Sequence, residues 1–357
     1  MLNKKLITGL QAINEALIEA AKKDKNILFF GEGITDPTSF YGTTKNLENY
    51  VDKNRLIEMP LSENSMVGAA IGASMFGKKV VINLHRVEFA LLAIEQLVNN
   101  AAKSHFISGG IHNIPIVIRL IVGRGWGQGP EHSQSLENMF SIFPGLKVVI
   151  PSLPNSAKQL LLDSISDKNP IVFIEHRWIH YTSEKKNNKK KFLFSSEKLT
   201  NGNHLTIVAS SIYIMECLVL IKELKKYKIN IELIDLKVTR PLDLSIIKKS
   251  VRKTGRLITI DLGNKNFGIG AEIISELVSD NMSLIKSEPT KIGMPNYPTP
   301  SSRGYLEGHY PDKDYILSKI IKYFPSLQRF KKEIIKNITK SKKLPIDVPN
   351  EEFKGPF

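Results

Sequence analysis

The chain has 357 residues, of which 42% are apolar, and this is enough to bury two ordinary hydrophobic cores. Its one cysteine, Cys217, excludes an intramolecular disulfide and any site made of several cysteines, which favours a cytoplasmic protein. The start of the chain lacks the apolar block and cleavage site of a signal peptide. The apolar run at 114–122 is interrupted by Arg119 and is well short of the ~20 residues that cross a bilayer. We therefore expect no membrane span.

The formal net charge of +15 suggests nucleic-acid binding at first sight. Forty of the 50 basic residues are lysine, however, and arginine, which makes bidentate contacts with phosphates and bases, is scarce. The lysines gather at 22–23, 185–191 and 331–343, without interleaved aromatic residues. We expect these to be a solvated linker and tail, and no nucleic-acid partner. A lysine-rich nucleic-acid-binding module is the non-enzymatic alternative, and a salt-sensitive gel shift would support it.

The first half of the chain alternates helical and strand-like patterns. A helix with apolar residues at helical spacing from Leu10 to Ala20 precedes a strand at 27–30. Further strands are predicted at 79–84, 114–122, 146–150 and 171–175, and further helices at 65–76, 89–105 and 155–166. This alternation is typical of a mostly parallel sheet with helices on both faces.

The run at 183–191 contains no apolar residue and cannot contribute to a core. Beyond it, strands are predicted at 204–209, 229–236 and 257–261, and helices at 214–226, 244–253 and 270–279. We therefore predict an α/β protein of two three-layer α/β/α domains with mostly parallel sheets. The domains are 1–182 and 201–325, joined by a lysine- and asparagine-rich linker at 183–200. A basic helix or tail follows at 326–357, with 345–357 extended or acting as an arm.

Ligands of open α/β sheets bind where strands end, so three segments that follow strands are candidate sites. They contain Gly31-Glu32-Gly33, Glu63 at the head of a helix, and His132 in a glycine-rich loop. Each has an ordinary structural explanation: a turn with positive φ, a first-turn acid worth ~0.5 kcal/mol after the N-cap Ser62, and a turn cap. Neither a Walker loop nor a Gly-x-Gly-x-x-Gly that opens a helix is present.

Taken together, the residues resemble a specific family. The likeness is carried by Pro60-Leu61-Ser62-Glu63, His132-Ser133-Gln134-Ser135 and the segments 89–103, 108–110, 144–149, 169–175, 234–243, 253–260 and 268–272. These resemble the β subunit of the thiamine-diphosphate-dependent component of 2-oxo-acid (pyruvate-type) dehydrogenases, within the transketolase superfamily. Order and spacing hold from about Thr8 to Phe324.

The resemblance implies a transketolase pyrimidine-binding domain followed by a transketolase C-terminal domain. Thiamine diphosphate then lies between two chains, one with the diphosphate and Mg²⁺ site and the other with the pyrimidine pocket. This chain resembles the second kind, and the Gly-Asp-Gly motif that holds Mg²⁺ is absent. The resemblance therefore implies an α-type partner that carries Mg²⁺, in an α₂β₂ assembly.

The resemblance also implies roles for individual residues. Glu63 would hydrogen-bond the pyrimidine ring nitrogen, which requires a buried carboxyl group with a raised pKa. Leu61, His85 and Phe89 would line the pyrimidine pocket, with Phe89 stacked on the ring, and His132 would face the substrate. Asp167 and Asn169 match a loop that binds a monovalent cation such as K⁺ in some relatives, although an Asp-x-Asn-Pro turn explains them equally well.

The sequence departs from the family beside the cofactor pocket. His85-Arg86 stands where most relatives carry apolar or small residues, and nearby loops carry Arg124, Trp126, His176, Arg177 and Trp178. An arginine at Arg86 would suit a substrate with a carboxylate, a phosphate or a sugar. Alternatively, Arg86 forms an ion pair with Glu88 or with an acid of the partner chain.

Two enzymatic functions follow from the resemblance. The first is decarboxylation of a 2-oxo acid with transfer of the acyl group to the lipoyl carrier of an acyltransferase. The alternative is transketolase-like transfer of a ketol or acyl unit to an aldehyde or sugar, without a lipoyl protein. Reduction of an artificial electron acceptor would favour the first, and carbon–carbon transfer without oxidation the second.

Overall fold

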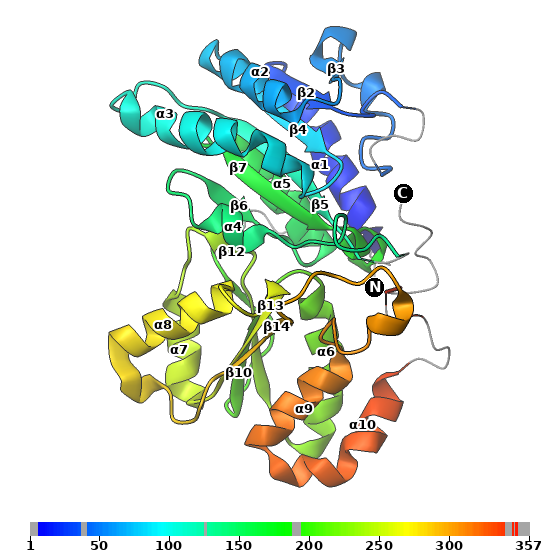
Figure 1. The fold of residues 1–357 in the computed structure, drawn as a ribbon, viewed down its shortest axis with the longest axis vertical. Coiled ribbons are helices and arrows are strands. Elements are labelled where there is room, and N and C mark those ends of the chain that lie inside the picture. Colours follow the sequence, from blue (N-terminus) through cyan, green and yellow to red (C-terminus); the bar gives the residue numbers. More distant parts are fainter. Residues whose placement is uncertain are drawn as a thin grey trace.

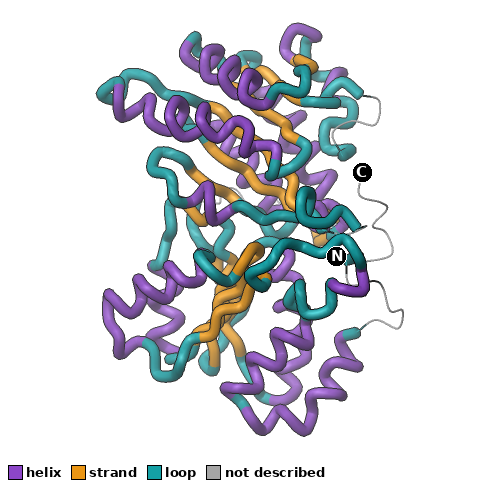
Figure 2. The backbone as a smooth tube through the Cα atoms, in the orientation of Figure 1, coloured by secondary structure: helices purple, strands orange, loops and turns teal. Residues whose placement is uncertain are grey.

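The structure, a computed structural model, describes residues 6–36, 41–124, 127–187, 194–339, 345, 347 and 348. Its strands form a seven-stranded sheet, a five-stranded sheet and a two-stranded ribbon. Figure 1 shows the two large sheets one above the other, each with helices on both faces. Figure 2 shows the same layering, with strands inside and helices outside. This confirms the predicted α/β fold, in which each of two units has three layers in the order α/β/α.

The seven-stranded sheet has the order β12-β6-β7-β5-β4-β2-β3 and is parallel except for β12. Its strands are β2 (Ile27–Gly31), β3 (Leu56–Glu58), β4 (Lys79–Leu84), β5 (Ile116–Val122), β6 (Lys147–Val149), β7 (Ile171–His176) and β12 (Val238–Arg240). The covering helices include α1 (Gly9–Lys23) and α5 (Pro154–Ser166) on one face and α2 (Glu63–Met75) on the other. Every residue of β5 is buried, as expected for a central parallel strand.

The five-stranded sheet has the order β14-β13-β10-β11-β9 and is parallel except for β9. Its strands are β9 (Glu197–Lys198), β10 (Leu205–Ala209), β11 (Ile231–Asp235), β13 (Leu257–Asn264) and β14 (Thr290–Met294). Helices α6 (Ile212–Leu224) and α9 (Lys313–Tyr323) cover one face, and α7 (Ser245–Thr254) and α8 (Ile269–Asn281) cover the other.

Three strand pairings cross the predicted divisions of the chain. The ribbon joins β1 (Leu6–Thr8) to β8 (Ser183–Lys185), and β9 pairs with β11, so both ends of the predicted linker are in strands. Strand β12 leaves the second unit and pairs antiparallel with β6 of the first sheet. The two units are therefore joined by backbone hydrogen bonds as well as by the chain.

Other segments differ from the sequence pattern. The single helix predicted over 89–105 is a 3₁₀ turn at Phe89–Ala93, a π-helical segment at Gln96–Ala101 and α3 (Ala102–Ile107). After residue 326, α10 (Lys331–Ile338) packs on α6 and buries Ile334 completely. Most of the segment 345–357, predicted as an arm, lies outside the described residues.

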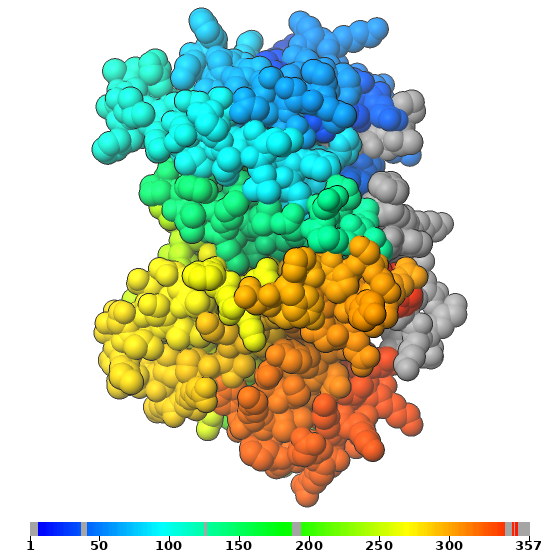
Figure 3. Space-filling view, in the orientation of Figure 1, coloured from blue at the N-terminus to red at the C-terminus, as the bar shows by residue number. Residues whose placement is uncertain are grey.

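The surface is hollowed between the two units. A groove of about 1010 Å³ runs between the loop after α4 (Glu137–Ser141) and the start of α8, and it is seen in Figure 3 between the green and yellow parts. In the described part of the chain, the helices fall short of the length and apolarity that a membrane crossing requires.

Candidate functional site

The candidate residues lie at the carboxyl edge of the seven-stranded sheet. The strands are in register there: Gly31 pairs with Asn83, and Val122 pairs with His176. The side chains that follow these strand ends include Glu32, His85, Arg86, Arg124 and Arg177. This edge is where parallel α/β sheets bind ligands, because the following loops converge there.

Glu63 is the first residue of α2 and is 7% exposed. The helix dipole stabilises a negative charge at this position. Among the described residues none donates a hydrogen bond to its carboxylate. Ser62 stands at the N-cap position, but its hydroxyl donates to Ser65 Oγ at 2.9 Å and makes no capping hydrogen bond to the helix backbone. Leu61, next to it, is 81% exposed.

The His85 side chain contacts Glu32 and Tyr41. Its Nδ1 lies 3.2 Å from Oε2 of Glu32, and its ring meets that of Tyr41 edge to face at 6.0 Å. The Tyr41 hydroxyl donates to the main-chain oxygen of His85 at 3.3 Å. Glu32 is buried, and its Oε1 accepts no hydrogen bond from the described residues. The sequence places Glu32 only in a turn, because no local pattern indicates its contact with His85, which follows the neighbouring strand β4.

Phe89 and His132 lie against each other in the structure. Their rings meet edge to face, with centroids 5.7 Å apart. The buried Nδ1 of His132 has no hydrogen-bond partner among the described residues. The loop of His132 is anchored on the segment after β4, because Arg86 Nη1 donates to its main-chain oxygen at 2.8 Å.

Glu88 completes this anchor. Its Oε1 accepts a hydrogen bond of 2.7 Å from the amide of Gln134, whereas its Oε2 is buried without a partner in the described chain. Burial raises the pKa of Glu88, against the opposing effects of its hydrogen bonds and of the charges of Arg86 and His132. The described residues contain no ion pair between Arg86 and Glu88, so the predicted alternative of an Arg86–Glu88 pair is not realised.

Arg124 and the aromatic rings beside it lie where the two units meet. The Arg124 guanidinium lies between two rings, 4.1 Å from that of Trp178 and 4.2 Å from that of Tyr310 in the second unit. His176 is buried beside Trp178. Trp126 lies outside the described residues. Arg124 therefore packs at the junction of the units, a role that the sequence did not indicate.

Asp167 and Asn169 lie at the opposite edge of the sheet, since they precede β7. Asp167 Oδ1 accepts from the amide and the side chain of Asn169 at 2.8 and 2.7 Å, and Oδ2 accepts from the Lys147 ammonium. Both carboxylate oxygens thus have protein donors, and the turn accounts for the sequence. Among the described residues no group of three or more His, Cys, Asp and Glu is arranged to hold a metal ion.

A buried ionic network supports the site from below. Arg119 donates to both oxygens of Glu175, at 2.6 and 3.1 Å, and to Asn83 Oδ1 at 2.5 Å. His180 Nε2 lies 3.0 Å from Glu175 Oε2. Burial acts to raise the pKa of Glu175, but the Arg119 charge and the His180 hydrogen bond outweigh it and lower that pKa to about 2. The network joins strands β4, β5 and β7.

We expect Arg119→Met to lower the free energy of unfolding by about 3 to 5 kcal/mol, because it leaves the Glu175 carboxylate buried without its cation. Urea denaturation followed by circular dichroism measures this loss. Lys158→Met is the matched control: Lys158 is partly exposed and pairs with Glu15 at 3.0 Å, and such pairs contribute about 1 kcal/mol or less. Equal losses in the two variants would contradict the prediction.

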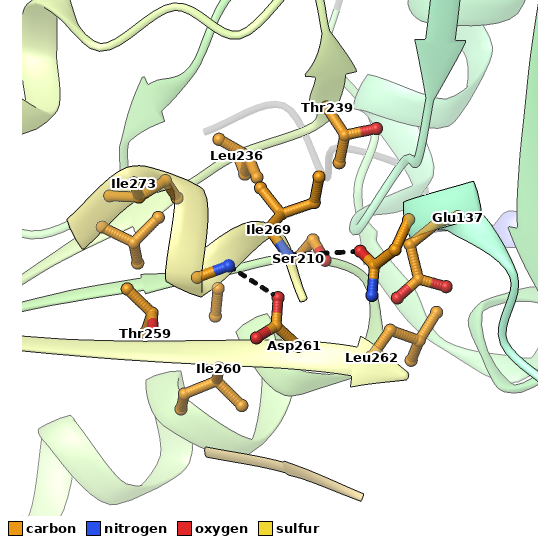
Figure 4. Close-up of a pocket in the computed structure, with 14 residues that line it drawn as sticks. Glu137, Ser210, Leu236, Thr239, Thr259, Ile260, Asp261, Leu262, Ile269 and Ile273 are labelled. Carbon is orange, nitrogen blue, oxygen red and sulfur yellow. Dashed lines mark hydrogen bonds between the residues drawn. The ribbon is translucent and has the colours of Figure 1, made fainter. Parts of the chain in front are cut away.

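Two buried acids, Glu137 and Asp261, line a cavity between the two units. The cavity has a volume of about 10 Å³ and room for one water molecule. Figure 4 shows side chains from α4, β13 and the start of α8 meeting there. Glu137 Oε1 accepts from the amide of Gly263 at 2.8 Å, and Asp261 Oδ1 accepts from that of Gly270 at 2.9 Å. The second oxygen of each carboxyl group has no partner among the described residues. Burial raises the pKa of both, that of Asp261 to about 7.

Comparisons with known proteins agree with this architecture. The family described as "Transketolase, pyrimidine binding domain" matches residues 5–180, and "Transketolase, C-terminal domain" matches residues 195–316. A solved structure described as "Split gene transketolase, inactive beta4 tetramer" has a TM-score of 0.74 and 18% identity, covering 89% of this chain and 98% of that one. At that identity the likeness concerns the fold alone.

Curated relatives share more of the sequence. The pyruvate dehydrogenase E1 component subunit beta of Gracilaria tenuistipitata var. liui is 35% identical over 298 residues, which is 83% of this chain and 92% of the relative. The mitochondrial subunit of Bos taurus is 34% identical over 279 residues, 76% of this chain and 77% of the relative. That of Saccharomyces cerevisiae is 30% identical over 331 residues, 88% of each chain.

Proposed function

The chain belongs to the family of pyruvate dehydrogenase E1 β subunits, built from the two transketolase domains, and from that premise we propose that it is the β subunit of an enzyme that decarboxylates a 2-oxo acid. The family depends on thiamine diphosphate. The acyl group would pass to the lipoyl group of an acyltransferase. The observation that carries the proposal is the buried Glu63 carboxylate at the same sheet edge as His132. We further infer that residues 1–182 and 201–325 act as the two domains.

Several buried polar atoms support the fit of the cofactor. Oε1 of Glu32 and Nδ1 of His132 are buried and have no hydrogen-bond partner among the described residues. Glu63 is 7% exposed as a residue, and the described residues donate no hydrogen bond to it. A pyrimidine ring with ring nitrogens and an amino group supplies such partners. We infer that Leu61, Glu63, His85 and Phe89 hold the pyrimidine ring. The Mg²⁺ and the diphosphate would be held by an α-type subunit.

The chemistry divides between the cofactor and the protein. Bound thiamine diphosphate supplies a nucleophilic carbon and an electron sink. The Glu63 carboxyl group holds a proton at the pyrimidine ring nitrogen, in a site where burial strengthens that hydrogen bond. The His132 imidazole carries a proton to or from the substrate, as histidine most often does in general acid–base catalysis. Arg86, which hydrogen-bonds the His132 main chain, orients the loop and faces the substrate.

Exposed apolar side chains support the need for a partner. Leu61, Phe76 and Phe106 are 81, 90 and 89% exposed, and they lie on or beside the helices that cover the first sheet. Exposed apolar side chains of this size are available for burial against another subunit. We infer an α₂β₂ heterotetramer.

Arg86 favours one alternative function. A buried guanidinium beside His132 suits a polar acceptor, as in transketolase-like transfer of a ketol or acyl unit to an aldehyde or sugar without a lipoyl protein. Under this alternative, Glu63 and His132 keep the same roles.

The complex with the α-type subunit decides between the two functions. We expect it to consume a 2-oxo acid and to reduce an artificial electron acceptor such as ferricyanide, only with thiamine diphosphate and Mg²⁺ present. Product analysis that shows carbon–carbon transfer to an aldehyde without reduction of the acceptor would support the alternative. If a correctly assembled, cofactor-saturated complex catalysed neither reaction, that result would contradict the proposal. The chain without its partner should bind the cofactor weakly in calorimetry.

A further inference from the structure

Phe267 is a large apolar residue that is 96% exposed. It lies between β13 and α8, and its backbone is in the left-handed region, with a φ of 56°. A residue other than glycine rarely adopts this conformation, because its Cβ atom comes close to the following carbonyl oxygen. Backbone strain of this kind is concentrated at functional sites. The turn therefore holds an exposed aromatic ring at a cost in conformational energy, which points to a role in binding.

Phe267 lines the groove of about 1010 Å³ between the two units (Figure 3). Ile142, which follows α4 in the first unit, lines the same groove and is 66% exposed. Leu146, Leu242 and Ile269 supply further apolar surface there. Apolar patches that polar residues surround mark sites where proteins meet. This face therefore carries an exposed aromatic ring next to an apolar hollow large enough to receive one.

The charged residues of the groove also complement one another. Lys147 is neutralised within the chain, because its ammonium group donates to the Asp167 carboxylate. Arg240 donates a hydrogen bond of 3.1 Å to the main-chain oxygen of Ser141, and it forms no ion pair among the described residues. Glu272, exposed in the first turn of α8, has neither a hydrogen bond nor an ion pair from its side chain to the described chain. One cation and one anion on this face are thus left without a counter-charge.

The groove suits a second copy of this chain. With one unpaired charge of each sign, it attracts neither a strongly acidic nor a strongly basic partner. A two-fold axis places the same patch on both sides of a contact, so each feature must find its complement within that patch. This face holds both halves of two such complements. One is the Phe267 ring with the apolar groove, and the other is the Arg240 guanidinium with the Glu272 carboxylate.

We propose that two copies of this chain meet through this groove, about a two-fold axis. The Phe267 ring of each copy enters the groove of the other, and Arg240 of each copy pairs with Glu272 of the other. Because both units line the groove, each copy also bridges the two units of its neighbour. The contact is compatible with the α₂β₂ assembly inferred above, which contains two copies, and it holds whichever reaction the site catalyses.

Photochemical cross-linking of the full chain, both alone and in the complex with the α-type subunit, tests this contact. Phe267→p-benzoylphenylalanine introduces a benzophenone group, which on ultraviolet irradiation bonds to C–H groups that touch it. We expect a covalent dimer of this chain, and mass spectrometry should place the cross-link in residues 138–147 or 239–242 of the second copy.

The same group at Met282 is the matched control. Met282 is 75% exposed and follows α8, whose 13 residues place it about 20 Å from Phe267. Met282→p-benzoylphenylalanine should therefore give no dimer linked through the groove. A cross-link from position 267 only to the α-type subunit, or no dimer in either preparation, would overturn the proposal. A dimer linked outside the two named segments would overturn it as well.

Charge reversal in the photoreactive chain tests the two pairs between copies. Arg240→Glu or Glu272→Arg alone sets like charges opposite each other twice, so each should lower the yield of covalent dimer about tenfold or more. The two substitutions together restore opposite charges and should return the yield to its original level. Glu276→Arg, at an exposed position one turn further along α8 and outside the groove, is the matched control and should change the yield little.

A thermal melt of each variant shows whether a fall in yield comes from unfolding instead. Yields that stay unchanged in both folded single variants, or that do not recover in the double variant, would overturn the proposed contact. None of these measurements depends on turnover. Their outcome is therefore separate from that of the proposed function, which the assay with a 2-oxo acid tests.

Discussion

Glu63→Gln should reduce 2-oxo-acid turnover by the complex with the α-type subunit about 10²- to 10⁴-fold, the range typical of lost proton-transfer catalysis. The side chain is 7% exposed at the first residue of α2, and no described residue donates a hydrogen bond to it. Glutamine keeps the size and can still form a hydrogen bond, but its amide cannot take up and release a proton. The loss should therefore fall on kcat, with the KM for the 2-oxo acid little changed.

The measurement is steady-state kinetics together with a thermal melt. Glu63 has no hydrogen bond to the described chain that substitution would break, so the unfolding temperature should stay near that of wild type. Glu48→Gln, an exposed acid of the same domain, is the matched control and should retain full activity. Full activity of Glu63→Gln would refute the role of the carboxyl group. Equal falls in stability and activity would assign Glu63 a structural role instead.

The regular strands and helices could be predicted because each has a local signal. The pattern of a central parallel strand is a continuous apolar run, and β5 is such a run. The short strand β3 has no such signal, since its three residues are only partly buried or exposed. Strand β12 could not be assigned to the first sheet, because its pairing with β6 depends on tertiary packing and not on its own residues.

The site was predicted less completely than the fold. Glu63 and His132 were identified through family resemblance, whereas their local sequence supports ordinary capping and turn explanations equally well. Glu32 and Glu88 acquire a role only when separate strand ends meet at one edge. The same holds for Glu137 and Asp261, whose carboxyl groups reach one cavity from different units. Distances across the chain decide such contacts, and a single sequence does not report them.

The buried acids at that cavity make the free energy of unfolding depend on pH. Asp261 has an ordinary pKa of 3.8, and burial raises it to about 7. The folded chain therefore binds a proton that the unfolded chain releases more readily. The resulting stabilisation is complete below pH 4 and is lost as the pH rises through about 7, with a total of roughly 4 kcal/mol for this residue. Glu175 has the opposite sign, because its pKa is lowered: its contribution is lost as the pH falls toward 2.

Asp261→Asn should remove part of the loss of stability that we expect at high pH. Asparagine resembles the protonated acid: its oxygen can accept from the Gly270 amide, and its amino group can donate toward Glu137. We expect the variant to be roughly 2 to 4 kcal/mol more stable than wild type at pH 8.5 and nearly equal at pH 5. Urea denaturation at a series of pH values measures both differences.

The matched control is Asp280→Asn on α8, because Asp280 is 45% exposed and pairs with Lys248 at the surface. It should change stability by less than about 1 kcal/mol at either pH. Asp235 is also buried, with a pKa raised to about 7, so the Asp261 variant should keep a weaker pH dependence of the same sign. Glu137 and Asp261 come from different units. The loss of stability above pH 7 should therefore weaken the contact between the two units. Wild type that is as stable at pH 8.5 as at pH 5 would show that the two acids are paired with a group that lies outside the described residues.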